Sequence, residues 1–247
     1  MYVEFLNNKL LQIKYDIGLF IDKFPFAYRF WRYLLELNAS SNKHLVHDQT
    51  EFVIEGYPRS GNSFAYAAFS HVQPHPVIVS HHTHRASQII TAVRKNLPTL
   101  VIIRPPIDAV ISFLSFRSYL TPRQCLRSYI DFYRRIEPYR DGFVLVKFED
   151  VISDFGQAIL DVNEKFNTSF VAFDHTEENI SHSIKLVEEM GEKYLGYHSE
   201  RKVGRPSKVR SNSKERLKRE FKNSELHKLV IESQRLYTFY LESNQKL

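Results

Sequence analysis

A glycine-rich stretch early in the chain carries the residue types of a phosphate-binding loop. Gly56, Gly61 and Ser63 have the spacing of the motif G-x-x-x-x-G-K-[ST]. Asn62 replaces the lysine of that motif, and the cation, Arg59, lies inside the loop. A strand that leads through such a loop into a helix presents backbone N–H groups and the positive end of a helix dipole, so these residues can hold a phosphate.

The same loop lacks the groups that hold a β,γ-phosphate together with Mg²⁺. In ATP-binding loops a lysine neutralises those phosphates, and an aspartate on a second strand helps to hold the metal. Asn62 cannot neutralise a phosphate, and the strand ends VIVS and VIIR offer no aspartate. A donor with a single 5′-phosphate that carries the transferable group needs neither, so the sequence predicts no metal site here.

The stretch PRSGNSF, from Pro58 to Phe64, resembles the 5′-phosphosulfate loop of sulfotransferases that use 3′-phosphoadenosine 5′-phosphosulfate (PAPS). That loop reads approximately P-[KR]-S-G-[ST]-[ST]-[WF], and Asn62 is the one departure from it. LVIIRPPIDAVISFLSF resembles a second signature of the family, an arginine that ends a strand and a serine eight residues later. The resemblance implies that Arg104 and Ser112 bind the 3′-phosphate, which distinguishes PAPS from ATP.

Two later segments extend the resemblance, which covers about two-thirds of the chain by motif order. VKFEDVISD is similar to the family's Tyr-Glu-Asp segment, with Phe148 in place of tyrosine, and no catalysis is assigned to it. RKVGRPSK resembles the late basic loop, R-K-G, that closes over the 3′-phosphate. Val203 stands where that pattern has glycine, so Arg201, Lys202 and Arg205 are all candidates for the contact.

Three histidines, His81, His82 and His84, follow the second predicted strand. Histidine is the usual residue to take a proton from an attacking hydroxyl at neutral pH. In the soluble sulfotransferases the base is a histidine about 22 residues before the 3′-phosphate arginine, and His82 lies 22 residues before Arg104. The resemblance therefore implies His82 as the base. The alternatives are His81 or His84 as the base in its place, a glutamate base, metal binding, or hydrogen bonding within the fold.

The reaction implied by the resemblance is transfer of a sulfuryl group from PAPS to a hydroxyl or amine, with 3′,5′-adenosine bisphosphate (PAP) as product and no metal. Catalysis falls to His82 and to Arg59, the cation for the bridging oxygen of the leaving phosphate. Phe64 either stacks on adenine or packs in the core. The implied donor-binding residues are Arg59, Ser60, Gly61, Asn62, Ser63, Phe64, Arg104, Ser112, Arg201, Lys202 and Arg205.

The elements that must position these residues alternate along the chain. Four apolar runs, which begin at Glu51, Pro76, Thr99 and Gly142, are typical of buried parallel strands, and helical patterns separate them. This order predicts an α/β fold, a three-layer P-loop NTPase-like parallel sheet flanked by helices. The stretch EDVISDFGQAILDVNEKF predicts one further amphipathic helix.

The two ends of the chain differ in composition from the middle. Residues 1–45 are expected to form a helical N-terminal extension packed on the sulfotransferase-like domain of residues 46–247. KFPFAYRFWRYLLEL mixes aromatic and basic residues, which favours a helix on the core or on a partner, or else one at a membrane surface. The net charge of +6 is concentrated in residues 201–222, where ten Lys or Arg face two Glu. A local surplus of this kind favours an anionic ligand.

These features leave two alternative functions beside the sulfotransferase. One is an ATP-dependent P-loop kinase or phosphotransferase, and the other is a polyanion- or membrane-binding protein that uses the basic segment. The only cysteine, Cys125, excludes an internal disulfide. With no signal peptide and no long apolar run, a cytoplasmic location is expected, with peripheral membrane contact through the N-terminal segment. A small-molecule or glycan acceptor, preferably carbohydrate or lipid-linked, is expected, and no nucleic acid.

Overall fold

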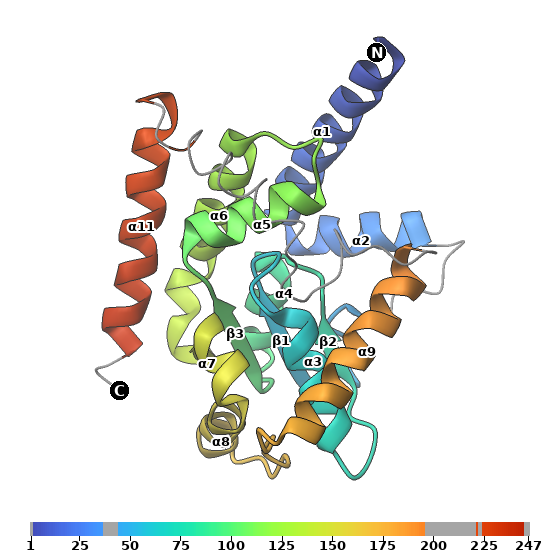
Figure 1. Ribbon diagram of the computed structural model, residues 1–247, viewed down its shortest axis with the longest axis vertical. Helices are drawn as coiled ribbons and strands as arrows, with labels where there is room; N and C mark the ends of the chain where they lie inside the picture. The colour runs from blue at the N-terminus through green and yellow to red at the C-terminus, as the bar shows by residue number, and fades with distance from the viewer. Residues whose placement is uncertain (1, 37–43, 196–220, 222–223, 245–247) are drawn as a thin grey trace.

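A computed structural model describes residues 2–36, 44–195, 221 and 224–244 of the chain. Its centre is a four-stranded sheet in which every pair of neighbouring strands is parallel, in the order β2-β1-β3-β4 (Figure 1). β1 sits between β2 and β3, and in this register Gly56 at its end pairs with Ile102. The strands are β1 (Phe52–Gly56), β2 (Val79–His81), β3 (Thr99–Ile103) and β4 (Val144–Lys147).

Helices follow each strand, as the alternating pattern predicts. The described helices of the core are α3 (Asn62–Val72), α4 (Ala86–Arg94), α5 (Pro106–Phe116), α6 (Pro122–Ile136), the short 3-10 helix η2 (Glu137–Gly142), α7 (Phe148–Ser153), α8 (Phe155–Phe166), α9 (Glu177–Leu195) and α11 (Ser224–Asn244). The helices α1 (Tyr2–Asp22) and α2 (Pro25–Glu36) form the N-terminal extension.

The sheet is the middle of three layers because its side chains alternate between two apolar clusters. Val101 and Ile103 of β3 pack with residues of α4, α5, α6 and α11 on one face. Leu100 and Ile102 of the same strand pack with residues of α3, α7 and α8 on the other. Successive side chains of a strand point to opposite faces, so a strand buried on both sides reads as one apolar run. The predicted three-layer α/β fold is therefore confirmed.

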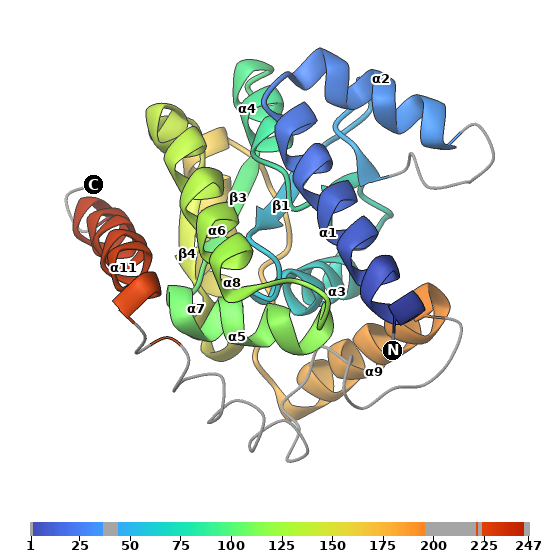
Figure 2. The same cartoon turned by 90° about the horizontal axis from the view of Figure 1, so that it is seen from above.

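Polar contacts join the N-terminal helices to this core. The Asp22 carboxylate, buried at the end of α1, pairs with Arg135 of α6 and accepts a hydrogen bond from Ser87 of α4. Arg135 also donates to the Asp22 carbonyl at 2.7 Å. Figure 2 shows α1 and α2 beside α4 and α6. The division into domains at residue 45 stays a prediction.

Two details differ from the sequence-based expectations. The stretch after β4 forms two helices, α7 and α8, because the backbone of Asp154 between them is not helical (φ −154°, ψ 63°). His81 is the last residue of β2, whereas we expected it after the strand.

The basic segment 201–222 lies outside the described residues except for Phe221. Among the described residues, no helix is both long enough and apolar enough to cross a membrane.

Candidate active site

The loop between β1 and α3 has the tight backbone that its glycines predict. Gly61 has φ 95°, in the left-handed region, and a Cβ there would lie 3.1 Å from the Phe148 ring. Only glycine takes this conformation without strain. α3 then starts at Asn62 without a side-chain cap. The N–H groups of its first turn have no partner within the helix, so they are available to an anion.

Asn62, which stands where ATP-binding loops have lysine, turns into the loop. Its side chain is buried, and its Nδ2 donates to the Tyr57 carbonyl at 3.1 Å. The other amide atom, Oδ1, lies beside Gly56, where an added Cβ would approach it to 3.0 Å. Asn62 therefore ties the two ends of the loop together. What it can offer an anion is its backbone N–H.

Arg59 links the loop to the second predicted signature. Its Nε donates to Ser112 Oγ at 3.2 Å, although 53 residues separate the two. Arg104 Nη1 in turn donates to the Arg59 carbonyl at 2.7 Å. Arg59 has φ 70°, which costs a non-glycine residue on the order of 1 kcal/mol, and the Arg104 contact helps to hold it there. The residues predicted to bind opposite ends of PAPS thus form one hydrogen-bonded unit.

Aromatic rings support both arginines. The Arg104 guanidinium lies 4.0 Å from the centre of the Phe148 ring, and the Arg59 guanidinium lies 5.3 Å from that of Phe116. Stacking on an aromatic face restricts a guanidinium to a plane and leaves its N–H edge for a ligand. Phe148, to which the sequence assigned only a landmark role, therefore orients Arg104.

The histidines form a chain of rings next to the loop. His82 Nε2 lies 2.8 Å from Ser63 Oγ, in the first turn of α3. The Nδ1 atoms of His82 and His81 share a hydrogen bond, and His81 Nε2 lies 3.0 Å from Nδ1 of the exposed His44. Tyr66 stacks on His81, with ring centres 3.6 Å apart. One hydrogen-bonded path thus runs from Ser63 through three imidazoles to the surface.

The environment of these rings keeps them neutral. Burial, together with the neighbouring imidazoles His84 and His44, lowers the pKa of His82 to about 3. Burial also lowers the pKa of His84 to about 4, with Arg85 and Arg59 adding to the effect. A neutral imidazole has one nitrogen that can accept a proton, so His82 and His84 start unprotonated, although their lowered pKa values make each a weaker base than free imidazole.

Glu55, the residue before Gly56, fixes the backbone on which the histidines stand. Its fully buried carboxylate accepts hydrogen bonds from Thr83 N at 2.7 Å, Thr83 Oγ1 at 2.6 Å and His84 N at 3.0 Å. Burial raises its pKa to about 7, opposed by those hydrogen bonds. His82 and His84 both have positive φ, 57° and 52°. The carboxylate therefore positions a strained loop rather than facing a ligand.

Other predicted residues have separate surroundings. Ser60 is fully buried, and its backbone N–H donates to the Tyr57 carbonyl at 3.2 Å. Phe64 is partly exposed and packs edge-on against Phe173, with ring centres 6.0 Å apart. Arg201, Lys202 and Arg205, predicted to contact the 3′-phosphate, lie outside the described residues.

Three residues of the site were missed by sequence reasoning. Glu55 had a usable signal, since it is a charged residue inside an apolar strand. Phe148 had one too, because it follows directly on β4, at the sheet edge where ligands of parallel sheets bind. His44 precedes β1 with no motif around it, and nothing in the sequence places it beside His81.

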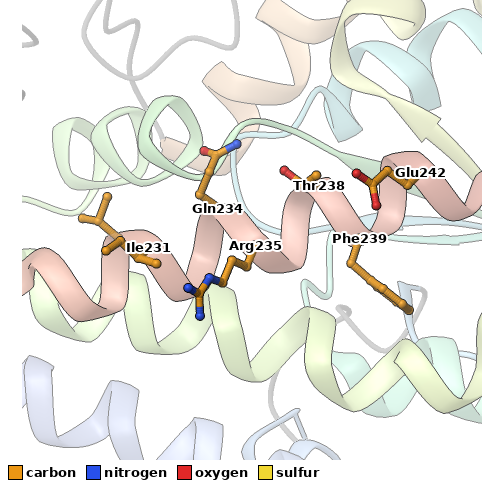
Figure 3. Close-up of a pocket in the computed structure, with 7 residues that line it drawn as sticks. Ile231, Gln234, Arg235, Thr238, Phe239 and Glu242 are labelled. Carbon is orange, nitrogen blue, oxygen red and sulfur yellow. The ribbon is translucent and has the colours of Figure 1, made fainter.

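The described residues of this site form no metal cluster. Within the described part of the chain, no group of three or more His, Cys, Asp or Glu side chains is arranged to hold a metal ion. A hollow of about 440 Å³ lies elsewhere, on the outer face of α11 (Figure 3). The side chains that line it belong to α11: Val230, Ile231, Gln234, Arg235, Thr238, Phe239 and Glu242.

Comparisons with known proteins give a weak likeness to a sulfotransferase structure. No protein-family model matches the sequence, and no curated protein matches it. Among solved structures, a crystal structure of the mouse sulfotransferase SULT7A1 complexed with PAP matches with a TM-score of 0.40 and 12% sequence identity. The match covers 76% of this chain and 90% of that one. A likeness at this level does not by itself assign a family.

Proposed function

We propose that this protein is a sulfotransferase that moves a sulfuryl group from PAPS to a hydroxyl or amine. The observation that carries the proposal is the unit formed by Arg59, Arg104 and Ser112. A loop suited to one phosphate and a separate arginine–serine pair lie side by side at the carboxyl ends of β1 and β3. A nucleotide with phosphates at both the 5′ and the 3′ position needs two such anion sites close together.

The proposed donor interactions follow from the groups present. The first-turn N–H groups of α3 and the Arg59 guanidinium bind the 5′-phosphosulfate, while Arg104 and Ser112 bind the 3′-phosphate. Phe148 holds the Arg104 plane in position. With the Asn62 side chain engaged by the Tyr57 carbonyl, the loop offers no lysine-like cation for a γ-phosphate. This supports a sulfuryl donor over ATP.

In the proposed reaction an oxygen or nitrogen of the acceptor forms a bond to sulfur as the bond from sulfur to the bridging oxygen breaks. The electron pair of the broken bond stays on the 5′-phosphate, where Arg59 stabilises the developing charge. The proton of the acceptor passes to Nε2 of neutral His82, the nitrogen that lies 2.8 Å from Ser63 Oγ. We propose a carbohydrate or lipid-linked acceptor.

Calorimetric titration with PAP, without added metal, tests the donor site directly. We expect micromolar binding that weakens at least about tenfold for 5′-AMP, which lacks the 3′-phosphate, and similarly in Arg104→Ala. Arg94→Ala is the matched control, because Arg94 is an arginine whose hydrogen bond goes to Tyr139, away from the loop. Binding of Mg-ATP with no binding of PAP would overturn the proposal in favour of a kinase.

A further inference from the structure

Helix α1 presents a stripe of large apolar side chains to solvent. Figure 1 shows the N-terminal part of this helix extending beyond the rest of the molecule. The stripe is spaced at intervals of four, three, four and three residues, which is the a/d pattern of a heptad repeat. It consists of Leu6, Leu10, Ile13, Ile17 and Phe20, all of them exposed.

The opposite side of α1 faces the protein, and Tyr15 on that side packs against Phe113 of α5, with ring centres 6.1 Å apart. Gln12 Nε2 donates to the Tyr119 carbonyl, and buried Asp22 pairs with Arg135. Gly18 is closely approached, since an added Cβ would lie 3.3 Å from the Arg85 guanidinium. α1 is therefore held to the protein on the side opposite the stripe, and the stripe itself stays exposed.

The width of the stripe indicates what covers it. An a/d stripe is the seam of a coiled coil, narrower than the face that a helix buries in its own domain, and of the other apolar residues of α1 Phe5 and Leu11 are exposed outside it. A helix that lies in a membrane surface has a broad apolar face opposite a strongly basic one. The side of α1 opposite the stripe instead contacts the protein through Gln12, Gly18 and Asp22. A second helix fits this seam better than lipid does.

We propose that the seam pairs with α1 of a second copy of this chain, in antiparallel orientation. Antiparallel pairing brings a positions of one helix against d positions of the other. Leu10 then faces the second copy's Ile13, and Leu6 faces its Ile17. Because the contact is two-fold symmetric, each of these layers occurs twice, and a single interface covers the exposed seam of both copies.

Charges beside the seam select the orientation. Lys9 and Asp16 occupy g positions, and Lys14 occupies an e position. An antiparallel pair brings g against g, so Lys9 of each copy meets Asp16 of the other. A parallel pair brings g against the e position five residues later, so Lys9 would meet Lys14. All three side chains are exposed, and the Asp16 carboxylate, which accepts from Gln124 at 2.9 Å, has lone pairs left for a lysine.

Sedimentation equilibrium of the full chain, from about 1 to 100 µM, tests the pairing. We expect a reversible dimer, and we expect Ile17→Glu to raise its dissociation constant about 100-fold or more by placing a charge in the seam. Ile152→Glu is the matched control, since Ile152 on α7 and Ile17 are both 49% exposed. Circular dichroism of each variant confirms that the fold is kept.

A charge swap separates the two orientations. In the antiparallel dimer Lys9→Asp places a second carboxylate against Asp16, and the dimer weakens by about threefold to tenfold; adding Asp16→Lys restores it. In a parallel dimer Lys9→Asp would instead strengthen the pairing through Lys14. A protein that stays monomeric throughout the range overturns the proposal, and so does a dimer that Ile17→Glu leaves intact. If the monomer instead sediments with phosphatidylglycerol vesicles and Ile17→Glu abolishes this, lipid covers the seam and the proposal fails.

Discussion

Helices α6 and α1 both carry apolar side chains at helical spacing, but α6 buries its stripe and α1 exposes its own. α6 buries Leu126, Tyr129 and Tyr133 among others, and Tyr129 Oη donates to the Arg104 carbonyl at 2.7 Å. α6 therefore supports the candidate site directly. α1 attaches to α6 through an ion pair and to α5 through the contact of Tyr15 with Phe113, and it leaves its stripe of apolar side chains exposed. The difference teaches that periodicity identifies a face of a helix but does not identify the partner of that face.

If the candidate site that α6 supports is the active site, the largest loss of activity should come from substitution of Arg59. We expect Arg59→Ala to lower kcat by about 100-fold or more, because it removes the cation beside the developing charge. The protein should stay folded, since the side chain is half-buried at the rim of the loop. Sulfuryl transfer from labelled PAPS to an acceptor measures this, with thermal unfolding as the control. Near-normal turnover in a folded variant would contradict the mechanism.

The next largest effect should fall on the loop itself. Asn62→Lys would restore the lysine of an ATP-binding loop, yet the side chain is buried against Gly56 and Tyr57. We expect a loss of about 2 to 3 kcal/mol in the free energy of unfolding and no gain of Mg-ATP binding. Urea denaturation and calorimetry check the two parts. A stable Asn62→Lys variant that binds Mg-ATP would show that the loop is a kinase loop lacking one residue.

A smaller effect, with a defined pH dependence, should come from Glu55. Its pKa is raised from 4.5 to about 7, so its contribution to stability is full below pH 4.5 and is lost as the pH rises through 7. The Glu55→Gln side chain cannot titrate, and its NH₂ group would place a second donor against the His84 N–H, which now donates to Oε2. We therefore expect the variant to be less stable than the wild type at pH 5.5, by about 1 to 2 kcal/mol.

Between pH 5.5 and pH 8 that stability difference should shrink, by on the order of 1 kcal/mol. The histidines titrate in both proteins, so their contribution cancels in the comparison. Denaturation midpoints at the two pH values measure the change. A difference that stays constant between the two pH values would mean that Glu55 is ionised in the folded protein throughout this range.

The smallest effect should come from α1. Leu10 is 66% exposed, so in a monomeric Ile17→Glu background Leu10→Ser should change the free energy of unfolding by less than about 0.5 kcal/mol. Leu126→Ser in α6, at a fully buried position, should cost several times more. Urea denaturation of both variants compares the two helices directly. Equal losses would mean that the α1 stripe packs on its own chain.

The sequence predicts the sheet well because each strand is a short apolar run buried on both faces. The run at Thr99 needs no other information to become β3, since alternate residues serve both core clusters. The loop is readable for a similar reason, because Gly61 and the start of α3 are local features of the backbone. The motif does not predict that the Asn62 side chain points into the loop, because that orientation depends on its hydrogen bond to the Tyr57 carbonyl.

Contacts between distant segments are the part that could not be predicted. His44 meets His81 because the segment before β1 runs beside β2, and no local pattern records this. Phe148 meets Arg104 because β3 and β4 are neighbours in the sheet, an order that periodicity does not determine. The orientation of α1 is of the same kind, since it depends on which side finds Tyr119 and Arg135.

The row of imidazoles from His82 to His44 has a consequence for how the site can be observed. Each ring-to-ring contact holds one proton, so a neutral ring that donates to one neighbour must accept from the other. The tautomeric states of the three rings are therefore coupled, and one ring cannot change its tautomer unless the others change with it. The nitrogen resonances of His44, at the protein surface, should then report the state of the ring beside Ser63. The protonation and tautomeric state of buried His82 could then be followed by NMR through the nitrogen signals of exposed His44.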